Sequence, residues 1–221
     1  MQKTEIKKIV ASNRTLLVVV VNFENDAINP EIFTSISDIF TEFTPYMHDN
    51  LQVLYVRDSK AQSIDGELIG GNCYNRHELM VAVPRWPVDM QEFRATLYHE
   101  LHHMARHQNV GYGKTLGGAV LSEGIATYYE EFKTDWSPPW GNATYSKKDV
   151  ADAISMWDSE DYNHSEWFFS SERGRWVGYA LGVEIVRKLY SDTFDLKASL
   201  RVLPNDEQVK AILAALNKET D

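Results

Sequence analysis

The stretch that decides the fold runs from Ala95 to Asn109 and reads ATLYHELHHMARHQN, with four histidines and one glutamate within nine residues. On a helix, side chains four positions apart lie on the same face, so His99 and His103 can bind one metal ion together. Glu100 follows the first histidine, where a carboxylate can take a proton from a water bound to zinc. The spacing therefore predicts the helix of a catalytic zinc site.

An apolar stripe at four-residue spacing supports a helix here. Phe93, Leu97 and Leu101 project about half a turn away from the histidine pair. One side of the helix is therefore expected to pack in the core, while the other carries the chemistry. The alternative is an ordinary amphipathic helix whose histidines are solvated.

The other two histidines are expected to lie outside the metal site. A straight helix carries His107 about 12 Å along the axis from His99, too far for both to bind one zinc ion. His102 faces another side of the helix, so we expect His102 and His107 at the surface or behind the ligands. The longer metzincin pattern needs a glycine and a histidine where Arg106 and Asn109 stand.

A catalytic zinc ion usually has three protein ligands and a water, so a third ligand is needed. The segment LSEGIATYYEE supplies Glu123, twenty residues after His103 and beyond a glycine-rich turn. Glu130 and Glu131 are read as solvated charges, although periodicity alone leaves Glu130 open. The predicted cofactor is Zn²⁺, and Glu123 is the predicted third ligand.

Two segments of the chain resemble known metallopeptidases. HELHH followed by LSEGIATYYE resembles the gluzincin group, in which two histidines and a downstream glutamate hold zinc. The chain resembles more closely a bacterial family of predicted zinc-dependent proteases that carries a later GYxxG helix. That helix corresponds here to WVGYALG, from Trp176 to Gly182, and the resemblance covers roughly residues 79 to 190.

The resemblance implies a role for each matching residue. His99, His103 and Glu123 are implied as zinc ligands and Glu100 as general base, which agrees with the spacing. Thr127 stands where some relatives carry an acidic residue that orients the first histidine. A hydroxyl serves that role only more weakly.

Peptide hydrolysis also needs a donor that stabilises the oxyanion beside the metal. Tyr179, in the GYxxG segment, is the predicted catalytic donor, and His164 is a poorer alternative. Tyr179 can equally be a packing residue, because Gly178 and Gly182 are four apart and such a spacing lets helices approach closely.

The remaining pattern predicts an α+β protein with a small N-terminal mixed sheet and a mostly helical C-terminal lobe. The resemblance implies a zincin-like fold in which the edge strand of that sheet lies next to the HExxH helix. By resemblance to zincins, LMVAV corresponds to that edge, where extended substrates bind, although it can equally be a plain core strand. GGNCYN is read as a turn. The start of the chain predicts a β-α-β unit from TLLVVVVNF, NPEIFTSISDIFTEF and LQVLYVRD. We expect one domain over residues 1–221, with lobes at 1–108 and 109–221.

Composition narrows the class of protein. The net charge of -10 makes nucleic acid an unexpected partner, and the single cysteine fits a reducing compartment. No apolar segment approaches the roughly 20 residues of a membrane span. The run from Leu16 to Val21 is read as a buried strand rather than a signal peptide, so a cytoplasmic protein is expected.

The predicted function is a zinc peptidase that hydrolyses peptide or protein substrates. One alternative is a binding or regulatory protein that has the zincin fold but no catalytic activity. A structural zinc site, however, does not require a general base, so the presence of Glu100 argues against this alternative. A di-iron oxidase is a weaker alternative. It needs a second ExxH, which this chain lacks.

Overall fold

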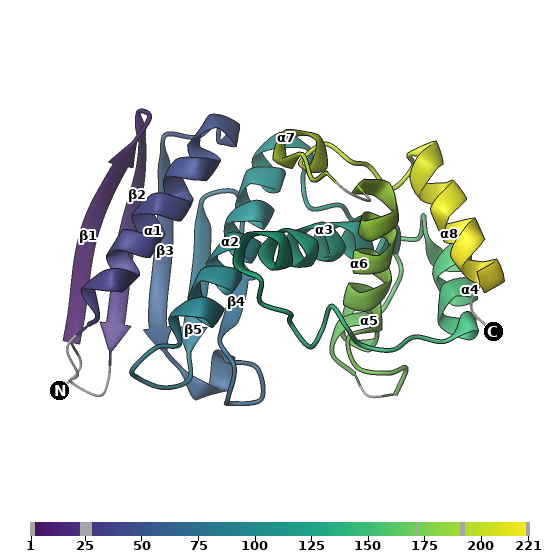
Figure 1. Cartoon of the computed structure of the whole chain (residues 1–221), viewed down its shortest axis with the longest axis horizontal. Helices are drawn as coiled ribbons and strands as arrows, with labels where there is room; N and C mark the ends of the chain where they lie inside the picture. The colour runs from purple at the N-terminus through teal and green to yellow at the C-terminus, as the bar shows by residue number, and fades with distance from the viewer. Residues whose placement is uncertain (1–2, 23–27, 171, 191–192, 220–221) are drawn as a thin grey trace. The chain divides into compact units, whose positions relative to one another are not determined.

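A mixed five-stranded sheet forms the first of the two units into which the chain divides, residues 1–109 (Figure 1). The order across the sheet is β1-β2-β3-β5-β4. Strands β2, β3 and β5 are parallel, whereas β1 and β4 run antiparallel to their neighbours. The strands are β1 (Lys3–Ala11), β2 (Arg14–Asn22), β3 (Leu51–Asp58), β4 (Gly70–Cys73) and β5 (Glu78–Val83).

The computed structural model describes residues 3–22, 28–170, 172–190 and 193–219. Phe23, which the sequence assigns to the end of strand β2, lies outside the described residues. The second unit comprises residues 110–221. The prediction that both units form one zincin-like domain stays a prediction.

The predicted β-α-β unit is confirmed by β2, helix α1 (Pro30–Phe43) and β3, with β2 and β3 parallel. Asn29 caps the helix by accepting a hydrogen bond from the backbone N–H of Glu31 at 3.0 Å, and Pro30 occupies the first helical position. The predicted apolar face is fully buried and consists of Ile32, Ile36, Ile39, Phe40 and Phe43.

Helices α1 and α2 (Met90–Asn109) lie against the same face of the sheet (Figure 1). On that face Val20, Val56 and Val81 stand side by side on neighbouring strands, and all three are fully buried. The register continues this row to Gly71 on β4. The row therefore ends at the sheet edge in a residue without a side chain.

An edge strand lies next to helix α2, as expected, but the assignment of LMVAV to that edge is wrong and the alternative of a core strand is confirmed. LMVAV lies in β5, which is an inner strand between β3 and β4, and the edge is β4, formed by the segment that the sequence presents as a turn. The turn that follows is made by Asn75, whose Oδ1 accepts from the backbone N–H groups of His77 (2.8 Å) and Glu78 (3.1 Å). Glycines weaken strand propensity, so the local pattern of β4 favours a turn until β5 pairs with it.

Strand β1 was not predicted. Its sequence mixes charged and apolar residues, and it pairs with β2 through a tight hairpin at Ser12 and Asn13. Both turn residues have positive φ, 47° and 64°, as a two-residue hairpin that matches the strand twist requires.

The second unit is helical, as predicted, and no strand occurs among its described residues. The core of this unit includes three large aromatic residues, each at most 3% exposed: Trp157, Trp167 and Phe168. Nowhere in the described chain is a helix both long enough and apolar enough to cross a membrane. The helices are α3 (Leu116–Thr134), α4 (Lys147–Met156), α5 (His164–Phe168), α6 (Val177–Tyr190), α7 (Leu196–Ser199) and α8 (Glu207–Glu219).

Candidate metal centre

Helix α2 brings two histidines face to face. Asp89 caps this helix, its Oδ1 accepting from the N–H groups of Gln91 (3.0 Å) and Glu92 (3.1 Å). Further along the helix, the Nε2 atoms of His99 and His103 lie 3.0 Å apart, and both residues are at least nine-tenths buried. The four-residue spacing thus aims two imidazole nitrogens at one point.

The distance between these nitrogens allows a test of whether they fit zinc. Two nitrogen ligands of one tetrahedral zinc ion, each at about 2.0 to 2.1 Å, lie about 3.3 Å apart. The observed 3.0 Å between the Nε2 atoms of His99 and His103 is close to that separation. The pair therefore fits a shared metal ion with little movement of either ring.

Helix α2 is buried on more sides than the sequence predicts. The expected stripe of Phe93, Leu97 and Leu101 is fully buried, but so is His102, for which a surface position was one prediction. A surface position for His102 is therefore wrong. His107 is partly buried, and its pKa is lowered mainly by burial and also by His103.

Glu100 lies against the edge strand of the same unit. A Cβ atom built on Gly71 of β4 would stand 2.2 Å from Oε1 of Glu100 and 2.6 Å from its Cδ and Cγ. Any side chain at this position would therefore occupy the space of the carboxylate. The absence of a side chain at Gly71 is what allows Glu100 to lie where it does.

Glu123 is buried in the second unit, on helix α3. The helix is capped by Thr115, whose hydroxyl accepts from the N–H of Gly118 at 3.1 Å. The hydroxyl of Tyr112, in the segment before the helix, donates a hydrogen bond to Oε1 of Glu123. Burial, followed by the charge of Glu123, raises the pKa of Tyr112 well above its ordinary value, so Tyr112 stays a donor at neutral pH.

Two further residues lie within electrostatic reach of Glu123. Burial raises the pKa of Tyr162, and the Glu123 charge adds to that rise. Burial lowers the pKa of His164, and the Glu123 charge opposes that effect. Two phenols, of Tyr112 and Tyr162, and the imidazole of His164 thus lie near Glu123 in its own unit.

Tyr179 lies in the first turn of helix α6. It is partly buried, its ring meets Phe168 edge to face at 5.2 Å between centroids, and it interacts electrostatically with Tyr112. The neighbouring Gly178 allows close packing, as expected, because a Cβ atom on it would stand 2.5 Å from the ring of Phe168. A catalytic role for Tyr179 stays a prediction.

Three residues further along α3 do not match their expected environments or roles. Glu130 is fully buried rather than solvated, and its Oε1 accepts from the indole N–H of Trp140 at 3.0 Å. Glu131 is only partly buried and pairs with Arg187 at 3.0 Å. The hydroxyl of Thr127 is buried without a hydrogen-bond partner in the described part of the chain, so it gives no support to the expected role in orienting a histidine.

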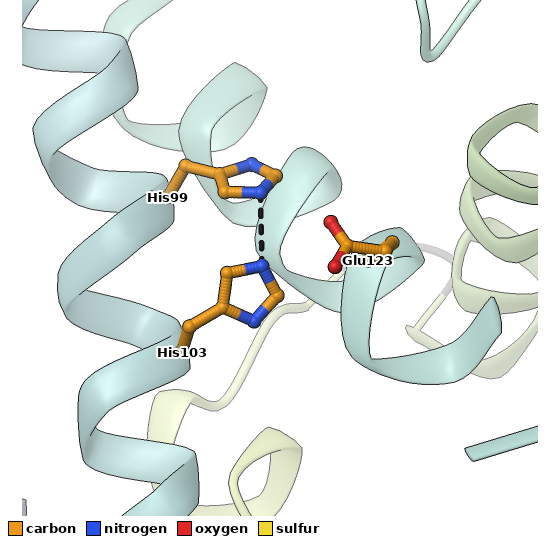
Figure 2. A group of neighbouring side chains, drawn as sticks. All are labelled: His99, His103 and Glu123. Atoms are coloured by element: carbon orange, nitrogen blue, oxygen red, sulfur yellow. Dashed lines mark hydrogen bonds between the residues drawn. The ribbon is translucent and has the colours of Figure 1, made fainter. Parts of the chain in front are cut away.

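His99, His103 and Glu123 form the group of metal-binding type among the described residues. Each offers one ligand atom, all three atoms lie within 4.8 Å of one another, and all three residues are buried. Figure 2 shows the two imidazole rings and the carboxylate turned toward one another. Two imidazoles and one carboxylate are a donor set that catalytic zinc sites use.

Comparison with known proteins identifies the family. The model of the family described as "Predicted Zn-dependent protease (DUF2268)" matches residues 33–208, which is most of the chain. This chain belongs to that family. Among curated proteins, none matches the sequence of this DUF2268 family member.

A solved structure shows the same fold at low sequence identity. The DUF2268 family member is similar to an aminopeptidase N family protein from Idiomarina loihiensis, with 12% identity and a TM-score of 0.53. The match covers 97% of this chain and 41% of that protein, so this chain spans less than half of the relative's length. The likeness shows a shared fold.

Two residues near the proposed site were missed from the sequence. Gly71 and Tyr112 lie 29 and 11 residues from the side chains that they contact, Glu100 and Glu123. Tyr112 stands between two glycines in VGYGKT, which indicates a turn but says nothing about what the tyrosine contacts. Their roles depend on contacts that no local pattern encodes.

Proposed function

We propose that this DUF2268 family member is a zinc-dependent peptidase of the gluzincin type. In it His99, His103 and Glu123 bind the metal, and Glu100 acts as general base on peptide or protein substrates. The observation that carries the proposal is the buried group of two imidazoles and one carboxylate, with Glu100 adjacent to His99 in the sequence. Membership in a family of predicted zinc-dependent proteases supports the same conclusion.

The chemistry divides between the metal and the chain. Zinc, when bound, supplies a Lewis acid that lowers the pKa of water and polarises a carbonyl group. Glu100 takes a proton from the attacking water and passes it to the leaving amine. His99, His103 and Glu123 would hold the metal with two neutral donors and one negative charge, so that a net positive charge would remain for stabilising an oxyanion.

Tyr179 is the proposed additional oxyanion donor. Support comes from its position beside Tyr112, which bonds Glu123, and from a phenol's ability to donate a hydrogen bond at neutral pH. His164, whose ring stacks on Phe168 at 4.5 Å between centroids, is the alternative donor. A donor of this kind typically contributes 100-fold or more to the rate, on the order of 3 kcal/mol.

Zinc content and peptide cleavage of the wild type and of Glu100→Gln test the proposal together. We expect the wild type to carry one zinc ion per chain and to cleave members of a broad peptide library. Glu100→Gln should keep the zinc and lose at least 100-fold in kcat/KM, because only the base is removed. A wild type that carries zinc but cleaves no peptide would instead favour the catalytically silent alternative.

A further inference from the structure

Tyr112 contacts one of the proposed ligands from outside the helix that carries it. Its hydroxyl donates a hydrogen bond to Oε1 of Glu123 on α3. We propose that Tyr112 is a positioning residue of the metal centre, whose hydroxyl holds the Glu123 carboxylate in the orientation that binds zinc. The inference rests on the proposed function, because it gives Tyr112 its role only if Glu123 is a ligand.

The backbone around Tyr112 makes a tight turn that folds back against the first turn of α3. Gly111 and Gly113 flank the tyrosine with φ of +82° and +94°, a region that other residues rarely adopt. A Cβ atom on Gly113 would stand 2.9 Å from the Cα atom of Gly118, in the first turn of the helix. This tight return places the Tyr112 hydroxyl beside Glu123, one turn further along α3.

Packing holds the ring in this place. Tyr112 packs against the core of the second unit, together with Tyr162 and Tyr179. Both neighbouring tyrosines also lie within electrostatic reach of its hydroxyl. A phenol fixed by packing has few rotamers left, so it presents its hydroxyl to Glu123 with little loss of entropy on bonding.

The hydrogen bond leaves the carboxylate free to bind metal. An ionised carboxylate has about four lone-pair sites on its two oxygens, so accepting from Tyr112 leaves acceptor capacity for a cation. Residues that hydrogen-bond to metal-binding carboxylates fix the ligand orientation, and removing them typically weakens metal affinity by about 10-fold to 100-fold. Tyr112 meets this description through its hydrogen bond to Glu123, its packing against the core and the glycine-flanked turn that carries it.

Zinc dissociation constants of single variants test the inference, with a chelator of known affinity as competitor. We expect Tyr112→Phe to bind zinc about 10-fold or more weakly than the wild type. The matched control is Tyr145→Phe, which removes the hydroxyl of another tyrosine packed on the same core, and its dissociation constant should stay within about twofold. The d–d absorption of the Co²⁺-loaded protein should also change in Tyr112→Phe and not in the control.

A double-mutant cycle shows whether Tyr112 acts through Glu123. In a Glu123→Gln background, adding Tyr112→Phe should leave the weakened zinc affinity unchanged, because the group that Tyr112 positions is already altered. Tyr112→Phe with wild-type zinc affinity would overturn the inference while the proposed function stands. If Glu123→Gln also binds zinc as tightly as the wild type, Glu123 is not a ligand and the proposed metal site itself fails.

Discussion

Gly124 and Gly182 lie in direct backbone contact where helices α3 and α6 pack together. A Cβ atom on Gly124 would stand 2.2 Å from the carbonyl carbon of Gly182, and one on Gly182 would stand 2.2 Å from the carbonyl oxygen of Val120. Gly124 follows Glu123 in the chain, and Gly182 lies on the helix that carries Tyr179. The two glycines therefore set how closely the helix of the proposed ligand approaches the helix of the proposed oxyanion donor.

Alanine at Gly124 or Gly182 is expected to destabilise the protein by about 2 to 3 kcal/mol. Alanine normally stabilises a helix relative to glycine by about 1 kcal/mol. A lower free energy of unfolding in these variants would therefore identify the backbone clash as the cause. Urea denaturation of each variant measures the effect, with Gln208→Ala at an exposed site on α8 as the neutral comparison. A variant as stable as the wild type would show that the two helices can separate at no cost.

Gly71→Ala is expected to reduce kcat/KM of the proposed peptidase about 100-fold while changing stability by less than about 1 kcal/mol. The added methyl group occupies the place of the Glu100 carboxylate, and a flexible side chain can rotate away at little cost in folding energy. Zinc content should be unchanged.

The double variant Gly71→Ala/Glu100→Gln decides whether the effect runs through Glu100. Its activity should equal that of Glu100→Gln alone, because residues acting through one group are not additive. A further loss in the double variant would mean that Gly71 acts on substrate binding or on the strand rather than on Glu100.

Gln108→Leu is expected to destabilise the first unit by about 2 to 4 kcal/mol. The buried Oε1 of Gln108 accepts from the backbone N–H groups of His48 (2.6 Å) and Asp49 (3.0 Å), and its Nε2 donates to the carbonyl of Arg76 (2.7 Å). Leucine leaves these partly buried backbone groups without their side-chain partner. Gln91→Leu, at an exposed position of the same helix, is the matched control, and equal losses in both variants would contradict the expectation.

Asp152→Asn is expected to lower stability by about 1 kcal/mol at pH 7 and to have no effect once the pH is well below the folded-state pKa of Asp152. Hydrogen bonds from Lys148 and then Arg173 lower the pKa of Asp152 below its ordinary value of 3.8. The stabilisation is therefore present above pH 3.8 and is lost as pH falls through the folded-state pKa. The magnitude is small because the side chain is 29% exposed.

Denaturation curves of wild type and Asp152→Asn over pH 2 to 7 check this expectation. Asp158→Asn serves as comparison, since that side chain is 73% exposed and lies 3.8 Å from Lys210. A difference between wild type and Asp152→Asn that does not shrink as the pH falls would assign the effect to packing rather than to charge.

Zinc is expected to stabilise the wild type by about 4 kcal/mol when present at 1,000 times its dissociation constant, and a chelator should reverse the gain. His99→Ala and His103→Ala should lose this stabilisation, because each removes one of the paired nitrogens. His107→Ala should retain it. If His107→Ala were the only variant to lose the stabilisation by zinc, His99 and His103 would be excluded as the ligand pair.

The sequence by itself determined the elements whose contacts repeat locally. Helical residues meet neighbours three or four positions away, so the apolar face of α1 and the pairing of His99 with His103 follow from spacing. The helical character of the second unit follows for the same reason. The choice of Glu123 drew on distance along the chain and on family resemblance, and its role as a ligand stays a prediction.

Only the tertiary structure decided which distant residues meet. Strand pairing joins residues far apart in sequence, so nothing local places β5 inside the sheet and the glycine-rich β4 at its edge. The burial of His102 and Glu130 likewise depends on elements that pack around them. Contacts such as Tyr112 with Glu123 arise from chain folding, which periodicity in a single segment does not record.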